Sequence, residues 1–243
     1  MVKRQNIRKG MIILTFLLFP AIFSYASPFL IIWGASLGII SGSFLFFIFL
    51  FIFSLFFGRI WCGYVCPAGG LQECLILAQD KKAKGGKLNL IKYIIWIPWL
   101  CTIVFFFVNA GGIKTVDAFF HIPNGISISG PFWVIIVYFF VVMIFTVLSL
   151  FAGKRASCHY LCWMAPFMIL GTKISRGINM PSLHIKTEKS KCNGCNRCSQ
   201  KCPMSLDVKY MVENEKMTNS ECIMCGECID ICSTKAIKYT FGK

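Results

Sequence analysis

Residues 192–203 read Cys192-Asn-Gly-Cys195-Asn-Arg-Cys198-Ser-Gln-Lys-Cys202-Pro203, and the same spacing returns in Cys222-Ile-Met-Cys225-Gly-Glu-Cys228-Ile-Asp-Ile-Cys232. Each run places three cysteines close together and a fourth after three further residues, a spacing that holds iron–sulfur cubanes. A structural zinc site uses pairs of cysteines and does not need four in each run. The two runs therefore predict two [4Fe–4S] clusters.

The fourth cysteine of each run is predicted to reach across to the other cluster, as it does in bacterial two-cluster ferredoxins. The expected ligands of cluster 1 are Cys192, Cys195, Cys198 and Cys232, and those of cluster 2 are Cys222, Cys225, Cys228 and Cys202. We assign residues 181–243 to an α+β ferredoxin domain of the bacterial 2[4Fe–4S] type. Because metal-binding thiolates must stay reduced, this domain is expected to face a reducing compartment.

The rest of the chain is apolar. Of the 243 residues, 56% are hydrophobic and 14% are charged, whereas globular proteins average about 45–50% and about 25%. Four apolar segments approach the roughly 20 residues that cross a bilayer, and they cover residues 11–33, 41–58, 92–110 and 132–151. Residues 1–180 are therefore expected to form an α-helical membrane domain of four transmembrane helices in contact with lipid.

The first apolar segment is the least regular of the four. Pro20 and Pro28 interrupt it, so we expect a kink or an early end near Ser27. The start of the chain also resembles a signal peptide, with a basic region, the apolar run Met11–Phe23 and a cleavage site at Ser24-Tyr25-Ala26. An internal repeat, described below, favours a first helix that is retained.

The formal net charge of +15 lies mainly in the loops between apolar segments. The N-terminus carries four Lys or Arg residues and residues 59–92 carry six, whereas the loop between the third and fourth segments carries only Lys114. Nucleic-acid binding is another explanation of such a charge, but the distribution follows the positive-inside rule. We therefore expect no nucleic-acid partner. The N-terminus and the ferredoxin domain are predicted to be cytoplasmic, on a multi-pass protein of the inner (cytoplasmic) membrane.

The membrane domain contains an internal repeat. The stretch Leu55-Phe-Phe-Gly-Arg leads into Cys62-Gly-Tyr-Val-Cys66, and Leu150-Phe-Ala-Gly-Lys leads into Cys158-His-Tyr-Leu-Cys162, 96 positions after the first cysteine. Each copy is expected to cross the membrane out and back before its C-x3-C motif. Two copies in the same orientation predict a two-fold axis along the membrane normal, which could bring the two cysteine pairs face to face.

Cys62, Cys66, Cys158 and Cys162 are the candidate working residues of the membrane domain. If each motif is helical, its two cysteines lie on one face at i and i+4. That arrangement suits two ligands of a shared metal, a redox-active dithiol, or close packing of small apolar side chains. Four thiolates at one axis favour a soft site, such as an iron–sulfur centre, iron, zinc or Cu(I). The matched placement of the pairs favours a redox or metal site at the cytoplasmic membrane face.

Neighbouring residues are weaker candidates. Gly63 occupies the place of His159 in the first motif, so the repeat does not favour His159 as a ligand. The basic residues before the motifs are expected to anchor helix ends. Cys74 and Cys101 have no matching partner and are expected to serve in packing.

The run Gly58-Arg-Ile-Trp-Cys62-Gly-Tyr-Val-Cys66-Pro67, the second C-x3-C motif and the double ferredoxin motif together resemble the NapH-type membrane ferredoxins. That family is related to the polyferredoxin parts of NosR- and CcoG-like proteins. The resemblance implies a quinol dehydrogenase membrane component, or an electron donor in metal-centre reduction or assembly. The second motif departs from the pattern, because Trp163 follows it and the proline is delayed to Pro166.

Three functions follow from these observations. The first is a membrane-bound iron–sulfur protein that relays electrons between the quinone pool and a partner redox protein, as an electron-transfer subunit of an oxidoreductase. The second is an accessory protein that reduces a metal or matures the metal centre of another enzyme, with the C-x3-C cysteines as its working site. The third is a structural anchor subunit of a redox complex.

Overall fold

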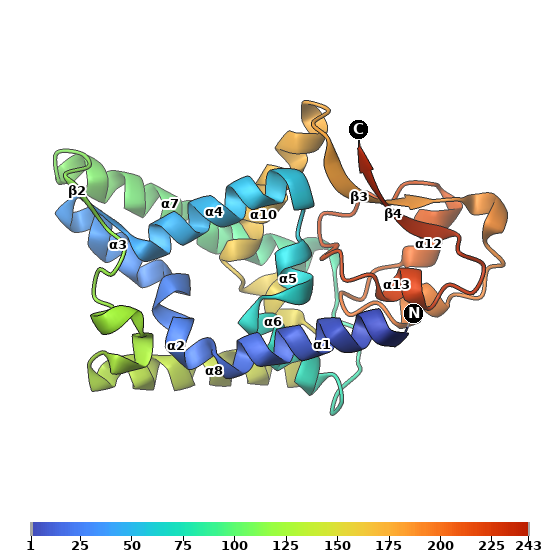
Figure 1. Ribbon diagram of the computed structural model, residues 1–243, viewed down its shortest axis with the longest axis horizontal. Coiled ribbons are helices and arrows are strands. Elements are labelled where there is room, and N and C mark those ends of the chain that lie inside the picture. Colours follow the sequence, from blue (N-terminus) through green and yellow to red (C-terminus); the bar gives the residue numbers. More distant parts are fainter. Residues whose placement is uncertain (1, 243) are drawn as a thin grey trace.

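The computed structural model describes residues 2–242 and consists of a helical part with a smaller domain at one end (Figure 1). The long helices run along the length of the molecule, and both chain termini lie near or within the smaller domain. The helical part contains α1 (Val2–Leu17), α2 (Phe19–Ile22), α3 (Pro28–Leu37), α4 (Gly42–Phe57), α5 (Ile60–Tyr64), α6 (Pro67–Leu75), α7 (Ile91–Asn109), α8 (Phe132–Ala152), α9 (Ala156–Tyr160) and α10 (Met164–Gly177).

Among the described residues, two helices are long and apolar enough to cross a membrane. They are the 24-residue stretch Gly86–Asn109, which includes α7, and the 21-residue α8. A third crossing would be formed by Lys3–Leu17 and Phe19–Ala26, which meet at a bend of 60°. Apolar side chains on α7 and α8 are widely exposed, with Val108 at 71% and Phe132 at 73%, as expected of surfaces in contact with lipid.

The predicted count of four crossings is therefore not reproduced in full. The first apolar segment is divided among α1, α2 and α3, because Pro20 and Pro28 interrupt it, as expected. Helix α4 covers the second segment but has only 16 residues. The apolar helices nevertheless indicate a membrane protein.

Glycines end the two helices that precede the cysteine motifs. Gly58 follows α4 with a φ of 58°, and Gly153 follows α8 with a φ of 110°. These backbone conformations favour glycine, so each helix stops and the chain turns into its motif. At the opposite end of the molecule, β1 (Ile39–Ser41) pairs in parallel with β2 (Thr115–Asp117), and Ile40 lies opposite Val116.

Each C-x3-C motif spans a break between two short helices. Cys62 lies within α5, and Cys66 follows it in extended backbone, directly before Pro67 at the start of α6. Cys158 lies within α9, and Cys162 falls between α9 and α10. Neither motif is therefore one continuous helix, so the condition for placing its two cysteines on one helix face at i and i+4 is not met. In the first motif the reason is Pro67, because a proline disfavours helical backbone in the residue before it.

The smaller domain is built on an antiparallel ribbon of β3 (Ser182–Thr187) and β4 (Ile237–Gly242), with Ile185 opposite Tyr239. Three short helices complete it, α11 (Arg197–Gln200), α12 (Val208–Glu213) and α13 (Glu227–Asp230). Its core is continuous with that of the helical part, since Leu50 and Met168 belong to the same buried cluster as Met204 and Ile223. The two parts therefore share one hydrophobic core.

Candidate metal centres

Two cavities in the smaller domain are each lined by four cysteines. One is lined by Cys202, Cys222, Cys225 and Cys228, and the other by Cys192, Cys195, Cys198 and Cys232. Each cavity thus combines three cysteines of one run with the fourth cysteine of the other. This grouping supports the predicted exchange of ligands, and a cavity ringed by four thiols fits a cubane cluster.

The loops around both cavities turn in the same way. Gly194 and Asn196 have positive φ angles in the first run, and Met224 and Gly226 have positive φ angles at the matching positions of the second. Successive residues that include left-handed backbone direct their N–H groups into a concavity that binds anions. Both cysteine runs therefore form loops whose backbone N–H groups are suited to a cluster bound by thiolates.

The two cysteine sets differ in burial. In the second set Cys225 is 8% exposed and Cys228 is 7% exposed, whereas in the first set Cys195 is exposed and Cys192 is half-buried. Burial raises the pKa of Cys225 to about 12 and that of Cys222 to about 11. Coordination to a metal would hold these thiols as thiolates despite their burial.

The second cysteine set lies against the first membrane motif. The Cβ atom of an alanine at Gly63 would stand 2.5 Å from the carbonyl oxygen of Ile223 and 3.3 Å from the Cα atom of Cys225. The Gln5 amide also donates to the Cys225 carbonyl at 3.1 Å. The cavity of Cys222, Cys225 and Cys228 is therefore the one closer to the helical part.

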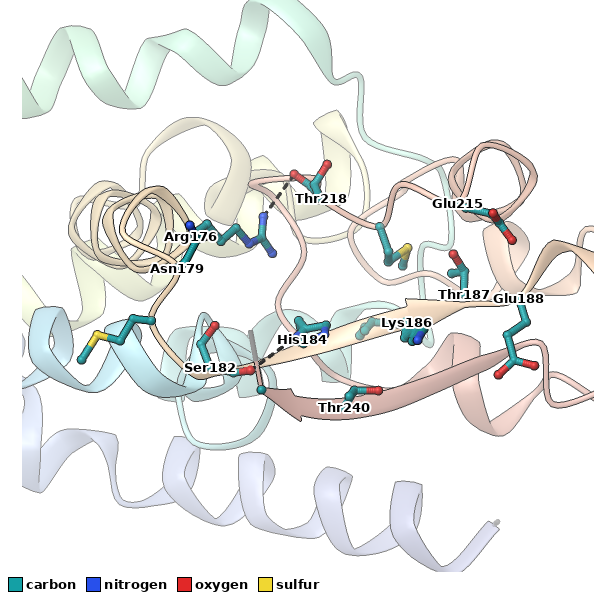
Figure 2. Close-up of a pocket in the computed structure, with 14 residues that line it drawn as sticks. Arg176, Asn179, Ser182, His184, Lys186, Thr187, Glu188, Glu215, Thr218 and Thr240 are labelled. Atoms are coloured by element: carbon teal, nitrogen blue, oxygen red, sulfur yellow. Dashed lines mark hydrogen bonds between the residues drawn. The ribbon is translucent and has the colours of Figure 1, made fainter.

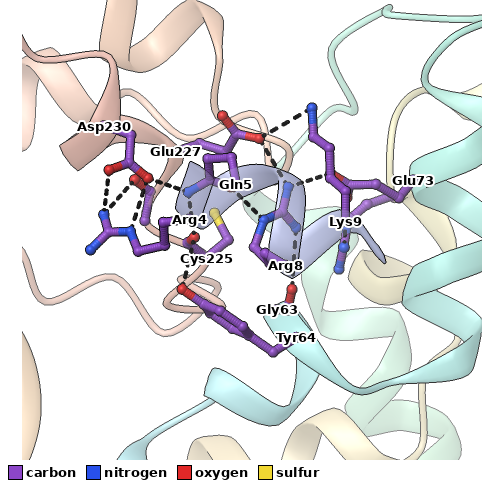
Figure 3. Close-up of polar contacts among 12 residues, drawn as sticks. Arg4, Gln5, Arg8, Lys9, Gly63, Tyr64, Glu73, Cys225, Glu227 and Asp230 are labelled. Carbon is purple, nitrogen blue, oxygen red and sulfur yellow. Dashed lines mark hydrogen bonds and ion pairs between the residues drawn. The ribbon is translucent and has the colours of Figure 1, made fainter. Parts of the chain in front are cut away.

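The N-terminal helix joins the two parts through a polar network (Figure 3). Arg4 pairs with Asp230 at 2.8 Å, and Arg8 pairs with Glu227 at 2.9 Å and with Glu73 at 2.5 Å. On the other side of Glu73, Arg155 lies 2.8 Å from the second carboxylate oxygen. Burial alone would raise the pKa of Glu73, but Arg155 and Arg8 lower it to about 2, so Glu73 stays ionised.

A second buried ion group joins the two parts elsewhere. Glu221, directly before Cys222, accepts from Lys92 at 2.5 Å and from Arg59 at 3.2 Å. Arg59 also donates to the Ser220 carbonyl at 2.9 Å. The three side chains of this group are at most 5% exposed. Arg59 and Arg155 thus hold buried carboxylates, rather than only anchoring helix ends as expected from the sequence.

The first cysteine of each membrane motif contacts a residue that follows the other motif. The thiol of Cys62 lies 3.6 Å from the sulfur of Met168, and Gln72 donates to the sulfur of Cys158 at 3.2 Å. Gln72 and Met168 each stand six residues after the second cysteine of a motif, and each contacts the first cysteine of the other motif. The helix that follows each motif also packs on the helix that precedes the other motif: α6 packs on α8, and α10 packs on α4.

The chemistry of these thiols reflects their burial. Burial raises the pKa of Cys162 to about 12 and that of Cys66 well above its usual value, and the nearby Cys158 and Cys62 raise both further. Each of these thiols would therefore be neutral at pH 7 unless a metal or a cation stabilises its thiolate. Within residues 2–242, no three Cys, His, Asp or Glu side chains lie close enough together to hold a single metal ion.

Both ring nitrogens of His159 have hydrogen-bond partners in the protein, so the structure does not support His159 as a metal ligand. Its Nδ1 atom lies 3.0 Å from Asn89 Oδ1 and its Nε2 atom lies 3.1 Å from the Met204 carbonyl. Burial lowers the pKa of His159 to about 4, so the ring is neutral at pH 7 and donates from one nitrogen only. Nε2 then donates to the carbonyl, and the Asn89 amide must turn to donate to Nδ1. The ring thus fixes α9 against the smaller domain.

A further cavity has no cysteine in its lining (Figure 2). It has a volume of about 660 Å³ and lies between the end of α10 and the β3–β4 ribbon, with Arg176, His184 and Glu188 in its lining. His184 bonds within its own strand, to the Ser182 carbonyl. This cavity is therefore separate from the cysteine sites.

The sequence analysis did not identify the buried carboxylates of these ion groups. One signal was available, because residues 1–180 contain only Glu73, Asp80 and Asp117 as acids. An acid so rare, seven residues after a C-x3-C motif, was a candidate for a buried pair. Glu221 adjoins Cys222 in sequence, but its partners Arg59 and Lys92 are more than 120 positions away and only the fold brings them there.

Comparisons with known proteins agree with the cysteine sites. A family profile described as "4Fe-4S binding domain" matches residues 42–84 and 129–181, and each of these segments contains one C-x3-C motif. A second profile, described as "4Fe-4S dicluster domain", matches residues 184–233. The profiles therefore connect iron–sulfur clusters with both the helical part and the smaller domain.

Three relatives each align with 75% of the chain. The chain is 26% identical to an uncharacterized protein of Methanocaldococcus jannaschii, covering 65% of that protein. It is 22% identical to the ferredoxin-type protein NapH of Haemophilus influenzae, covering 62%, and 23% identical to the putative electron transport protein YccM of Escherichia coli, covering 52%. It thus spans less than two thirds of each relative. No solved structure matches the chain significantly.

Proposed function

We propose that this chain, a homologue of the ferredoxin-type NapH proteins and of YccM, relays electrons between the membrane quinone pool and a partner redox protein. The chain would hold two [4Fe–4S] clusters, with Cys192, Cys195, Cys198 and Cys232 as the ligands of cluster 1 and Cys222, Cys225, Cys228 and Cys202 as those of cluster 2. Iron–sulfur clusters supply one-electron chemistry, and the protein supplies their position and surroundings.

The observation that carries this proposal is the order of the cysteine sites. Gly63, inside the first membrane motif, contacts the loop of Cys225. The cysteines of cluster 1 lie farther out, and Cys195 among them is exposed. The sites therefore form a series from the helical part to the surface, and a partner redox protein could approach the exposed end. A purely structural anchor would not need this series.

An apolar cavity in the helical part supports a quinone as the membrane partner. It has a volume of about 400 Å³ and is lined by residues of α3, α4, α7 and α10, including Phe47, Trp99 and Phe167. Trp96 also lines it, and its indole N–H is buried without a hydrogen-bond partner among the described residues. A quinone combines an apolar ring with carbonyl oxygens that can accept from such a donor.

The proposed setting is the inner membrane, with the N-terminus, the C-x3-C motifs and the smaller domain in the cytoplasm. The Lys and Arg distribution supports this orientation. We propose residues 1–180 as the membrane domain and residues 181–243 as the ferredoxin domain. The boundary falls between the end of α10 at Gly177 and the start of β3 at Ser182.

The relay is tested on the full chain, purified in detergent without oxygen. We expect at least about eight iron and eight sulfide per chain, and reduction of the clusters by a soluble quinol, or their oxidation by the matching quinone, followed by EPR. Zinc in place of iron would end the cluster assignment. Intact clusters that exchange no electrons with quinol or quinone, in a chain that reduces copper or iron salts, would instead support the accessory role in metal reduction.

A substitution at Gly63 tests whether contact between the two parts matters. In Gly63→Ala the new Cβ would meet the Ile223 carbonyl at 2.5 Å, so the smaller domain must shift at an expected cost of about 1–3 kcal/mol. We expect slower reduction of the clusters by quinol, measured by stopped-flow absorbance at unchanged iron content. Gly177→Ala is the matched control, because a Cβ there meets nothing within 4 Å. Equal rates in both variants would contradict the role of this contact.

A further inference from the structure

The surroundings of the four membrane cysteines carry an excess of buried positive charge. Arg59 and Arg155 each stand three residues before the first cysteine of a motif, and both are at most 2% exposed. Arg59 shares Glu221 with Lys92, which is also buried. This first group therefore contains two buried cations and one buried carboxylate.

The second group differs from the first in its number of carboxylates. Arg155 shares Glu73 with Arg8, and both guanidinium side chains are fully buried. Glu227 also pairs with Arg8 at 2.9 Å, so the two arginines of this group face two carboxylates, and Lys9, 3.7 Å from Glu227, is half exposed. Only the first group therefore keeps a buried positive charge in excess. Buried charges are normally balanced, because leaving one unpaired is costly.

One N–H group on each of the two arginines also lacks a hydrogen-bond acceptor. The Nε atoms of Arg59 and Arg155 are both buried without a partner among the residues that the structure describes. Arg155 Nη1 donates to the carbonyl of Cys62 at 2.9 Å, so its guanidinium group lies at the first motif. Arg59 directly precedes α5, the short helix that contains Cys62. A buried donor without an acceptor costs free energy, so we expect an acceptor near each of these Nε atoms.

We propose that Arg59 and Arg155 balance the charge of an iron–sulfur centre held by Cys62, Cys66, Cys158 and Cys162, and donate N–H···S hydrogen bonds to it. This inference rests on the relay proposed above, to which it adds a third centre inside the helical part. An oxidised [2Fe–2S] or [4Fe–4S] core with four thiolates carries two negative charges, and the buried cations near the motifs would help to balance them. Hydrogen bonds to the sulfurs are among the features that tune such a centre.

The comparison with known families favours a cluster over a single ion at this site. The membrane cysteines, like the eight cysteines around the two ferredoxin cavities, are not close enough together to hold one metal ion. The profile described as "4Fe-4S binding domain" also matches both segments that contain these motifs.

The test is iron retention by the full chain, purified without oxygen. Wild-type protein is expected to contain iron in excess of the two ferredoxin clusters, and a Cys66→Ser/Cys162→Ser variant is expected to lose that excess alone. In Arg59→Gln and Arg155→Gln, we expect the excess iron to be lost to a chelator about 10–100-fold faster, which is the usual effect of removing an outer partner of a metal site. Arg59→Lys keeps the charge and is expected to restore most of the retention.

Two controls separate this result from misfolding and from failure of the relay. Lys173→Gln removes an equal charge from an exposed position on α10 and is expected to leave retention unchanged. The EPR signals of the two ferredoxin clusters report in each variant that the chain is folded, whatever the outcome with quinol. Wild-type protein with iron for two clusters only, zinc at the membrane cysteines, or unchanged retention in Arg59→Gln would each overturn the proposal.

Discussion

Replacement of Cys202 by alanine is expected to remove the cluster held by Cys222, Cys225 and Cys228 and to leave the cluster of its own run in place. Cys202 lines the same cavity as those three cysteines and is 8% exposed, so water cannot readily take its place as a ligand. We expect the iron of the ferredoxin domain to fall from about eight to about four per chain. EPR of the reduced protein, together with iron and sulfide analysis, measures the change.

The matched variant is Cys232→Ala, which should have the opposite effect. Cys232 lines the cavity of Cys192, Cys195 and Cys198, so its loss should spare the second cluster. The two variants are also expected to differ in reduction by quinol, because only Cys232→Ala keeps the cluster next to Gly63. If each substitution instead removes the cluster of its own run, the exchange of the fourth ligands is refuted.

Replacement of Glu73 by glutamine is expected to be the most destabilising change outside the cysteines. Glu73 is 8% exposed and lies between Arg8 and Arg155, which are both fully buried. Removal of one member of a buried ion pair typically costs about 3–5 kcal/mol, because the remaining charge stays buried without a partner. We expect a loss of about that size in the free energy of unfolding, measured by denaturant titration of the protein in detergent.

Glu213→Gln is the matched control for that measurement. Glu213 pairs with Lys209 at 3.6 Å on the surface of α12, and its side chain is 44% exposed. Exposed pairs contribute little, so the change should stay within about 0.5 kcal/mol. Equal stability of the two variants would show that the charges around Glu73 find other partners or water.

The ferredoxin domain is where sequence and structure agree most closely. The spacing of Cys192, Cys195 and Cys198 forces a tight loop around one site, and the second run repeats it. Such spacings act within a few residues, so they can be read along the chain. The apolar segments were equally readable, because hydrophobicity is a local property, although α4 is shorter than a typical membrane span.

The surroundings of the membrane cysteines could not be predicted from such local features. The repeat indicated that the pairs could meet, but not that Pro67 would break the first motif between α5 and α6. It also did not reveal that Gln72 of one copy would contact Cys158 of the other. These features depend on how α6 and α10 pack against helices far away in the chain.

The amino-acid sequence by itself determined the spacing of the cysteines in each run, the apolar helical content and the charge distribution. Each of these depends on interactions between near neighbours or with the solvent. Only the tertiary structure decided which charges are buried and what they face. Arg59 is 162 positions from Glu221, and Arg8 is 65 positions from Glu73. The physical reason is that the free energy of a buried charge depends on all the groups packed around it, and packing brings these together from distant parts of the chain.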